Sequence, residues 1–379
     1  MHQTLNKLYA VQLHFQTNLF PHIKQELGYL TKLQQKFIEV LEVSQIDSFV
    51  AYVGNRACRP TKSRMALVRA FIAKAVYNMP TTQTLIERLK SDLSLRRLCG
   101  YEKVEQIPSQ PTFSRAFDEF SKMQIAERAH KNIIKEYLSQ QLIGHISRDS
   151  TAINAREKPL KKSGKTAKVA KKRGRPPKGE KREKEPTRIE KQSDSMTLKA
   201  MLSDLPKPCD IGTKMNSKGY KTSWQGYKLH IDSSDTGIPI SCILTSASVH
   251  DSQVAIPLAT STNLRVTNLY DLMDAAYDSP IIKEHSQSLG HLPIIDINPR
   301  RSGQKAELEE ELKAKRNANY KTAQMIRYNH RSAVERLNGR LKDEFNARMV
   351  RVKGHAKVMS HLMFGIIALT VDQLMRFLE

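Results

Sequence analysis

The stretch Trp224-Gln-Gly-Tyr-Lys-Leu-His-Ile-Asp232 decides the class of fold. Its residues from Tyr227 to Ile231 alternate between apolar and polar, as those of a half-buried β-strand do. The turn residues Asp235-Thr-Gly-Ile238 follow, and Pro239-Ile-Ser-Cys-Ile-Leu-Thr245 returns as a second strand. The sequence therefore predicts an antiparallel hairpin in the second half of the chain.

Three further apolar runs around this hairpin predict strands, namely Leu142 to Ile153, Asn268 to Met273 and Leu292 to Asp296. Asp251 stands where it can cap a helix that runs through Leu258. Three antiparallel strands followed by strands that alternate with helices predict an α/β core with a mixed sheet flanked by helices.

Residues 1–140 are predicted to be all-α, because apolar residues recur at helical spacing, for example from Ile23 to Leu41. Ser109-Gln-Pro-Thr-Phe113 opens another helix, on which Arg115 is expected to be exposed and to contact DNA. Short helices joined by turns are compatible with a helix-turn-helix DNA-binding domain. A plain helical bundle is the alternative that this pattern leaves open.

The composition points to a polyanionic partner. The 379 residues include 62 Lys and Arg against 38 Asp and Glu, which gives a formal net charge of +24. Such an excess predicts binding to DNA or RNA. The N-terminus does not resemble a signal peptide, and no apolar run reaches the ~18 residues of a membrane span. Four widely separated cysteines suggest neither zinc nor disulfides, so we expect a cytoplasmic protein without a membrane partner.

Residues 156–205 are expected to form a basic, disordered insertion. Its first part, 156–191, holds sixteen Lys or Arg against five Glu and no aromatic residue, too little apolar surface to fold. Four consecutive residues in it resemble the core of an AT-hook, which places arginines in the minor groove: Arg173, Gly174, Arg175 and Pro176. The alternative is a solvated linker that binds DNA only by releasing counterions.

Four residues near the C-terminus share one predicted helix face: Tyr328, Arg331, Glu335 and Lys342. At about 100° per residue they fall within a stripe roughly 60° wide. One carboxylate between two cations suits a site that handles a metal ion together with phosphates. A solvated face held by weak ion pairs is the simpler alternative.

A metal site needs further carboxylates beside Glu335. Asp149 and Asp274 each lie at or near the end of a predicted strand, where α/β sheets place their sites. Spacing alone does not separate them from three other acids, Asp271, Asp278 and Asp296.

The motifs around these residues resemble those of bacterial insertion-sequence DDE transposases. Asp274-Ala-Ala-Tyr-Asp-Ser279 is similar to the family's second-aspartate motif, although Ala276 stands where a glycine is usual, and Arg148-Asp149-Ser-Thr151 is similar to its first-aspartate strand. The residues Tyr328, Arg331, Glu335 and Lys342 match its Tyr-Arg-Glu-Lys signature in order and spacing. The resemblance covers most of the chain.

The resemblance implies an RNase H-like catalytic core, formed by 141–155 and 206–379. Asp149, Asp274 and Glu335 are then expected to hold two Mg²⁺ or Mn²⁺ ions for phosphoryl transfer. Arg331 and Lys342 would clamp DNA phosphates, and Tyr328 would contact the DNA backbone or brace the helix.

The implied function is that of a transposase that binds terminal inverted repeats, cleaves double-stranded DNA at the element ends and joins them to target DNA. A homodimer in the synaptic complex and a location at the bacterial nucleoid follow from the same resemblance. Two alternatives remain open, a non-catalytic DNA-binding or architectural protein and an RNase H-fold nuclease that never joins strands.

Overall fold

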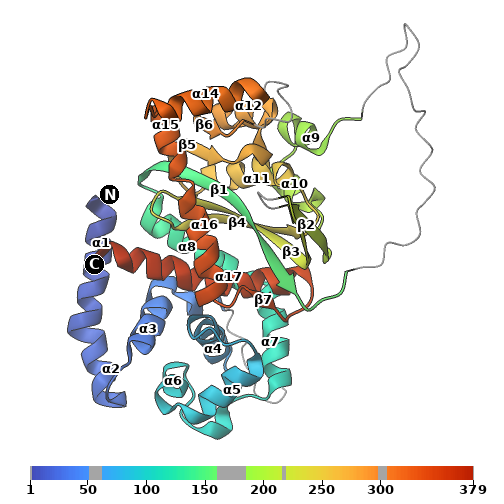
Figure 1. Cartoon of the computed structure of the whole chain (residues 1–379). Helices are drawn as coiled ribbons and strands as arrows, with labels where there is room; N and C mark the ends of the chain where they lie inside the picture. Colours follow the sequence, from blue (N-terminus) through green and yellow to red (C-terminus); the bar gives the residue numbers. More distant parts are fainter. Residues whose placement is uncertain (1, 51–61, 160–184, 216–218, 298–304, 379) are drawn as a thin grey trace.

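The computed structural model describes residues 2–50, 62–159, 185–215, 219–297 and 305–378. A mixed β-sheet with its helices occupies the upper half of Figure 1, and most of the N-terminal helices occupy the lower half. The long helix α17 (His355–Met375) passes between the two halves. The predicted division into an α/β part and an all-α N-terminal part therefore matches the observed order of elements.

Several helices of the N-terminal part begin at residues that favour a helix start. Thr81 caps α5 by accepting a hydrogen bond from the backbone of Thr84, and Pro111 lies in the first turn of α7. The helices are α1 (His2–His14), α2 (Phe20–Leu27), α3 (Lys32–Ser44), α4 (Arg64–Val76), α5 (Thr82–Ser91), α6 (Leu93–Leu98), α7 (Gln110–Lys122) and α8 (Ile125–Leu138).

The sheet is mixed, as predicted. Its path runs β2-β3-β1-β5-β6, and β4 and β7 pair with β3 and β1. The β1–β3, β3–β4 and β2–β3 pairs are antiparallel, whereas β5 is parallel to β1 and β6 is parallel to β5. The strands are β1 (Leu142–Ala155), β2 (Asp210–Met215), β3 (Lys221–Ser234), β4 (Pro239–Ser246), β5 (Thr267–Met273), β6 (Leu292–Ile295) and β7 (Met349–Val350).

Helices cover both faces of this sheet. Consecutive residues of a strand point to opposite faces. Arg148 is bonded to Asp232, which accepts a hydrogen bond from Thr262 of α11, while Asp149 accepts one from Asn338 of α16. The helices of this part are α9 (Arg188–Asp194), α10 (Leu198–Asp204), α11 (Ser252–Asn263), α12 (Pro280–Ser288), α14 (Lys305–Asn317), α15 (Ala323–Asn329) and α16 (Ser332–Glu344).

The apolar helix α17 joins the two parts into one core. It contacts α3, α4, α7 and α8 of the N-terminal part as well as β4. One cluster of buried residues consequently runs from Leu8 to Leu374. By length and composition α17 is the one helix in the described residues that could cross a membrane, and most of its apolar window is buried inside the protein. Its packing is that of a core helix.

The prediction of a disordered insertion over 156–205 is wrong for its last part. Residues 188–204 form α9 and α10, which pack against α11. Gln192 is buried and donates to the backbone of Gln253, and Leu205 joins an apolar cluster with Leu258. These apolar contacts give the segment a partner surface that a composition count does not reveal. The AT-hook-like residues Arg173, Gly174, Arg175 and Pro176 lie outside the described residues.

The predicted capping role of Asp251 is also wrong. Its side chain makes no capping bond to α11. It accepts a hydrogen bond from the Ser150 hydroxyl at 2.8 Å and pairs with Lys228 at 3.1 Å. These two partners on β1 and β3 draw the carboxylate back toward the sheet.

Candidate active site

Asp149 and Asp274 lie on neighbouring parallel strands at equivalent positions. The β1–β5 ladder pairs Ile146 with Asp271 and Ser147 with Leu272. Two residues further along each strand are Asp149 and Asp274, just beyond the last paired residues. Parallel strands lie roughly 4.8 Å apart. The register therefore places the two predicted acids side by side where the strands separate.

Burial raises the pKa of both carboxyls, and a neighbouring acid adds to the shift of each. Burial is the main cause that raises the pKa of Asp149 to about 6. The charge of Asp274 also raises this pKa, whereas the backbone hydrogen bond of Ser150 and the charges of Arg331 and Lys214 lower it. Burial also raises the pKa of Asp274, and nearby Asp251 adds to this shift. A bound divalent cation relieves this kind of penalty on closely placed acids. The two aspartates thus fit a hard metal such as Mg²⁺.

The single helix predicted for Tyr328 to Lys342 is instead two helices. Tyr328 lies on α15, whereas Glu335 and Lys342 lie on α16. Between them the backbone amides of Arg331 and Val334 bond to carbonyls three residues earlier, which interrupts the α-helical ladder. Arg327 of α15 lies over the ring of Tyr270 on β5, while α16 packs on β1 and β3. Each helix thus follows its own contact with the sheet.

Glu335 is held by Arg331 in this structure. The Arg331 guanidinium donates to the Glu335 carboxylate at 2.6 Å, and the Glu335 side chain is 55% exposed. Within the described part of the chain, no three Asp, Glu, His or Cys side chains are grouped closely enough to hold a metal ion. Asp149 and Asp274 are therefore brought together, but Glu335 has not joined them.

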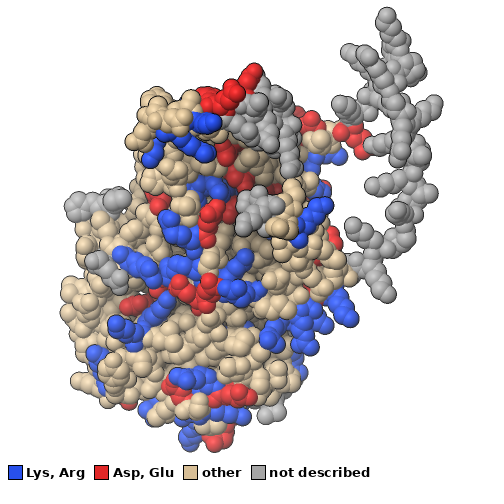
Figure 2. Space-filling view, viewed as in Figure 1, with Lys and Arg blue, Asp and Glu red and all other residues tan. Residues whose placement is uncertain are grey.

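Cations surround the two aspartates. The charges of Arg331 and Lys214 lower the pKa of both aspartates. Lys342 is also close enough for the charges of Lys214 and Asp149 to affect its pKa. Burial lowers the pKa of Lys342. Figure 2 shows Lys and Arg side chains gathered over α16 and across the middle of this face, with acidic side chains between them. The arrangement suits a polyanion laid across the acids.

Sequence reasoning missed three side chains of this site, Asn338, Lys214 and Asp251. The Asn338 amide donates to Asp149 Oδ2 at 3.3 Å, and it lies three residues after Glu335 on the same face of α16. That spacing is a signal that could have found it. Lys214 comes from β2, a strand that the sequence pattern did not predict, and Asp251 comes from the start of α11.

The rival acids have partners of their own. Asp271 is buried and accepts bonds from Ser286 at 2.5 Å and from Asn268 at 3.1 Å, which fits a structural role. Asp278 pairs with Lys283 at 2.7 Å. Asp296 lies 3.5 Å from the hydroxyl of Tyr328. The guanidinium of Arg331 lies over the ring of Tyr328, 5.8 Å from the ring centroid. Tyr328 thus braces Arg331 in this structure.

Two family models match the chain. One described as a Transposase DDE domain matches residues 141–371, and one described as a Transposase domain (DUF772) matches residues 24–119. The first match alone spans more than half of the chain. No curated protein and no solved structure matches the chain.

Both matches place the chain among the transposases. The chain belongs to the Transposase DDE domain family, whose members cleave and transfer DNA and generally use divalent metal ions. The predicted resemblance to insertion-sequence DDE transposases is confirmed at this level.

Proposed function

We propose that this transposase binds the terminal inverted repeats of its element, cleaves the DNA at the element ends and joins the ends to target DNA. The reaction is two-metal phosphoryl transfer, with Asp149, Asp274 and Glu335 as the ligands of two Mg²⁺ or Mn²⁺ ions. The observation that carries this proposal is the side-by-side placement of Asp149 and Asp274, with Asp149 perturbed to a pKa of about 6. The mixed sheet with helices on both faces supports an RNase H-like core.

The ions, when bound, supply an activated nucleophile and stabilise the leaving oxygen. The chain contributes placement. Asp149 and Asp274 are fixed by their strands, and Asn338 orients Asp149 through its hydrogen bond. Glu335 completes the set once it leaves Arg331, which frees the guanidinium for a DNA phosphate. Lys342 is a second phosphate ligand, because it makes no ion pair within the described residues.

DNA contacts outside the acids follow the same proposal. Arg115 is exposed on α7, so the N-terminal helices contribute to binding of the element ends. The basic tract with Arg173 and Arg175 adds sequence-independent affinity through counterion release. Two transposon ends must be held together for joining, so the DNA-bound form is a homodimer.

The test is a Glu335→Gln variant on a plasmid that carries the element with its native flanks. We expect metal-dependent end cleavage to fall on the order of 10³-fold or more, with DNA affinity kept, because the variant removes a ligand and little else. Glu311→Gln, which removes an exposed acid of α14, is the matched control and keeps cleavage. Cleavage that survives in Glu335→Gln refutes the ligand assignment, and cleavage without joined products in the unmodified protein identifies a nuclease.

A further inference from the structure

A basic cleft lies away from the acids, where the N-terminal helices meet the C-terminal part. It is bounded by α4, α5 and α7 on one side, and by residues 351–353 and α17 on the other. Its volume is about 260 Å³, room for on the order of eight waters at roughly 30 Å³ each. A phosphodiester with its hydration therefore fits.

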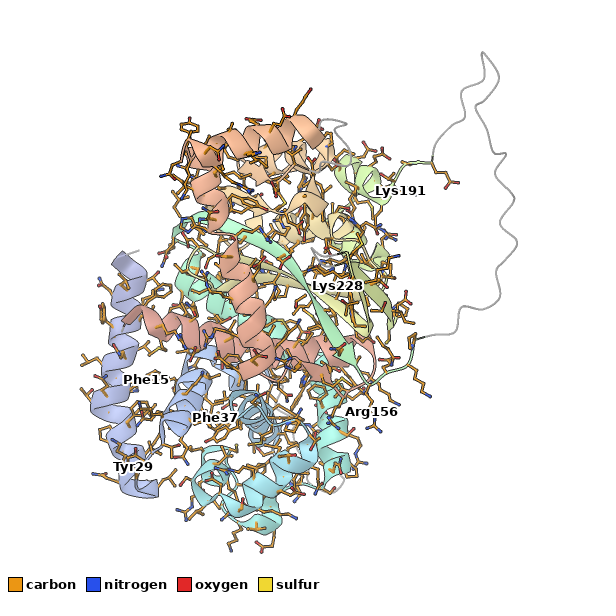
Figure 3. All side chains as sticks on the ribbon, viewed as in Figure 1. Phe15, Tyr29, Phe37, Arg156, Lys191 and Lys228 are labelled. Atoms are coloured by element: carbon orange, nitrogen blue, oxygen red, sulfur yellow. The ribbon has the colours of Figure 1, made fainter. Side chains whose placement is uncertain are left out.

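The lining of this cleft is strongly positive. Its cations come from three separate segments of the chain: Lys74, Arg351, Lys353 and Lys357. Arg156 lines an adjoining pocket that shares Lys74 and Arg351 with this cleft. Among the described residues that line it, none is acidic. Where the structure describes the chain, Lys357 alone of these has an acidic partner, Asp118 at 2.9 Å outside the cleft. Figure 3 labels Arg156 at the end of β1, beside α7.

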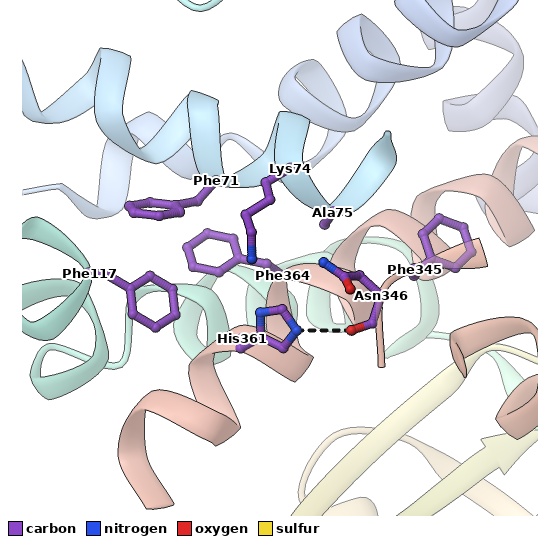
Figure 4. Close-up of a pocket in the computed structure, with 8 residues that line it drawn as sticks. All are labelled: Phe71, Lys74, Ala75, Phe117, Phe345, Asn346, His361 and Phe364. Atoms are coloured by element: carbon purple, nitrogen blue, oxygen red, sulfur yellow. Dashed lines mark hydrogen bonds between the residues drawn. The ribbon is translucent and has the colours of Figure 1, made fainter. Parts of the chain in front are cut away.

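Lys74 is the feature that a purely structural role does not explain. It is 8% exposed, and its side chain makes no hydrogen bond or ion pair within the part of the chain that the structure describes. Buried charges are normally paired, because an unpaired one loses its hydration without compensation. Figure 4 shows its ammonium reaching from α4 toward His361 of α17, among Phe71, Phe117 and Phe364.

The charge state of this group suits an anion. Burial, and then the charge of Arg351, lowers the pKa of Lys74 to about 8, which leaves the ammonium largely protonated at neutral pH. His361 stays neutral, because burial lowers its pKa to about 3, and its Nε2 lies 2.9 Å from the Asn346 carbonyl. A protonated lysine without a counter-charge thus faces the cleft.

Two helices also begin at the cleft. Thr82, the first residue of α5, and Gln110, the first residue of α7, both line it. The start of a helix carries a partial positive charge and unsatisfied amides, which favour anions such as phosphate. Ser109 makes no capping bond at the start of α7. Helix starts and side-chain cations therefore act in the same direction.

We propose that this cleft binds a phosphate of the DNA backbone and so couples the N-terminal helices to the catalytic part on the bound duplex. The proposal rests on the proposed function, since it assigns a subsite for the same DNA. Arg156 follows Asp149 by seven residues of β1 and its continuation, roughly 23 Å at about 3.3 Å per residue. A duplex that runs along β1, at about 3.4 Å per base pair, would place the bound phosphate roughly seven base pairs from the cleaved one.

The test measures DNA affinity against salt for the full chain, using two duplex oligonucleotides of unrelated sequence. We expect Lys74→Met and Arg351→Gln each to reduce the slope of log K against log salt by about 0.9, equally on both duplexes, because a backbone contact carries no sequence information. Lys24→Gln, an exposed cation on α2 that lines no part of the cleft, is the matched control and changes the slope less.

Thermal melting separates binding from folding. Because Lys74 is an unpaired buried cation, Lys74→Met is expected to keep or raise Tm while DNA binding weakens. A lowered Tm with an unchanged salt slope overturns the cleft assignment and shows a packing role. If the wild-type protein cleaves element ends but the salt slopes of the two cleft variants equal that of Lys24→Gln, the cleft assignment alone is overturned. Wild-type protein that binds neither duplex overturns the proposed function together with it.

Discussion

The guanidinium of Arg331 donates to the carboxylate of Glu335 at 2.6 Å, one turn apart on the helix face that overlies Asp149. This pair would compete directly with the assembly of the proposed three-carboxylate metal site. The acid that a metal requires and the cation that a phosphate requires neutralise each other while neither ligand is bound. If Glu335 binds metal and Arg331 binds phosphate, as proposed, metal binding and DNA binding are coupled, because each ligand releases the partner of the other.

Arg331→Gln should therefore tighten metal binding while it weakens function. An exposed ion pair of this kind is worth about 0.2–1 kcal/mol, so we expect Mn²⁺ affinity to rise roughly 1.5- to 5-fold in calorimetric titrations. Cleavage of element ends should fall, because a phosphate ligand is lost. Arg336→Gln on the exposed side of α16 is the control, since in the described residues the Arg336 side chain hydrogen-bonds to Ser332 and not to an acid. Unchanged Mn²⁺ affinity in Arg331→Gln contradicts the competition.

The sequence anticipates this site in part, and the physical reason differs from residue to residue. Asp149 and Asp274 could be placed because alternation and strand ends are local properties of the sequence. The pairing of Asp149 with Asn338 across 189 positions could not, since it depends on how α16 docks on the sheet. The break between α15 and α16 was missed for the same reason, because tertiary contacts at Arg327 override a continuous helical pattern. Likewise, α9 and α10 are helices because they have α11 to pack against.

Asn338 positions Asp149, so its removal should act on catalysis more than on DNA binding. Without the amide donor at 3.3 Å, the carboxylate loses the partner that fixes its orientation. Loss of such an outer partner typically lowers metal affinity or activity about 10- to 100-fold. We expect Asn338→Ala to show this loss in cleavage assays titrated with Mn²⁺, with unchanged duplex affinity. Cleavage at the wild-type rate over the whole metal titration rules out the positioning role.

The buried pair Arg148–Asp232 should be a large determinant of stability. The two side chains are 2% and 0% exposed, and two hydrogen bonds of 2.8 Å join them between β1 and β3. Removing one partner leaves an uncompensated buried charge, so Arg148→Met should lower the free energy of unfolding by about 3–5 kcal/mol. Chemical denaturation followed by circular dichroism measures this.

The double variant Arg148→Met with Asp232→Leu is the internal control for that prediction. It removes both charges, so it should recover much of the lost stability. If the double variant is as unstable as the sum of the two single changes, the charges contribute independently and the pair is not the source of the effect.

Acid should destabilise the protein through its buried histidines. Burial lowers the pKa of His130 and of His361 from the ordinary 6.5 to about 3. Between these values the unfolded chain binds protons that the folded protein excludes, so this stability is fully present above pH 6.5 and falls as pH drops toward 3. Each histidine contributes a slope of up to about 1.4 kcal/mol per pH unit.

Urea unfolding at several pH values should show this dependence. His130→Gln should reduce the slope of unfolding free energy against pH by the contribution of one histidine, whereas His22→Gln, at an exposed position, should not. The comparison between variants matters, because Glu127 opposes the trend: burial raises its pKa to about 7, so its contribution is lost as pH rises from 4.5 through 7. A His130→Gln profile that is parallel to the wild-type profile would show that His130 does not contribute to acid unfolding.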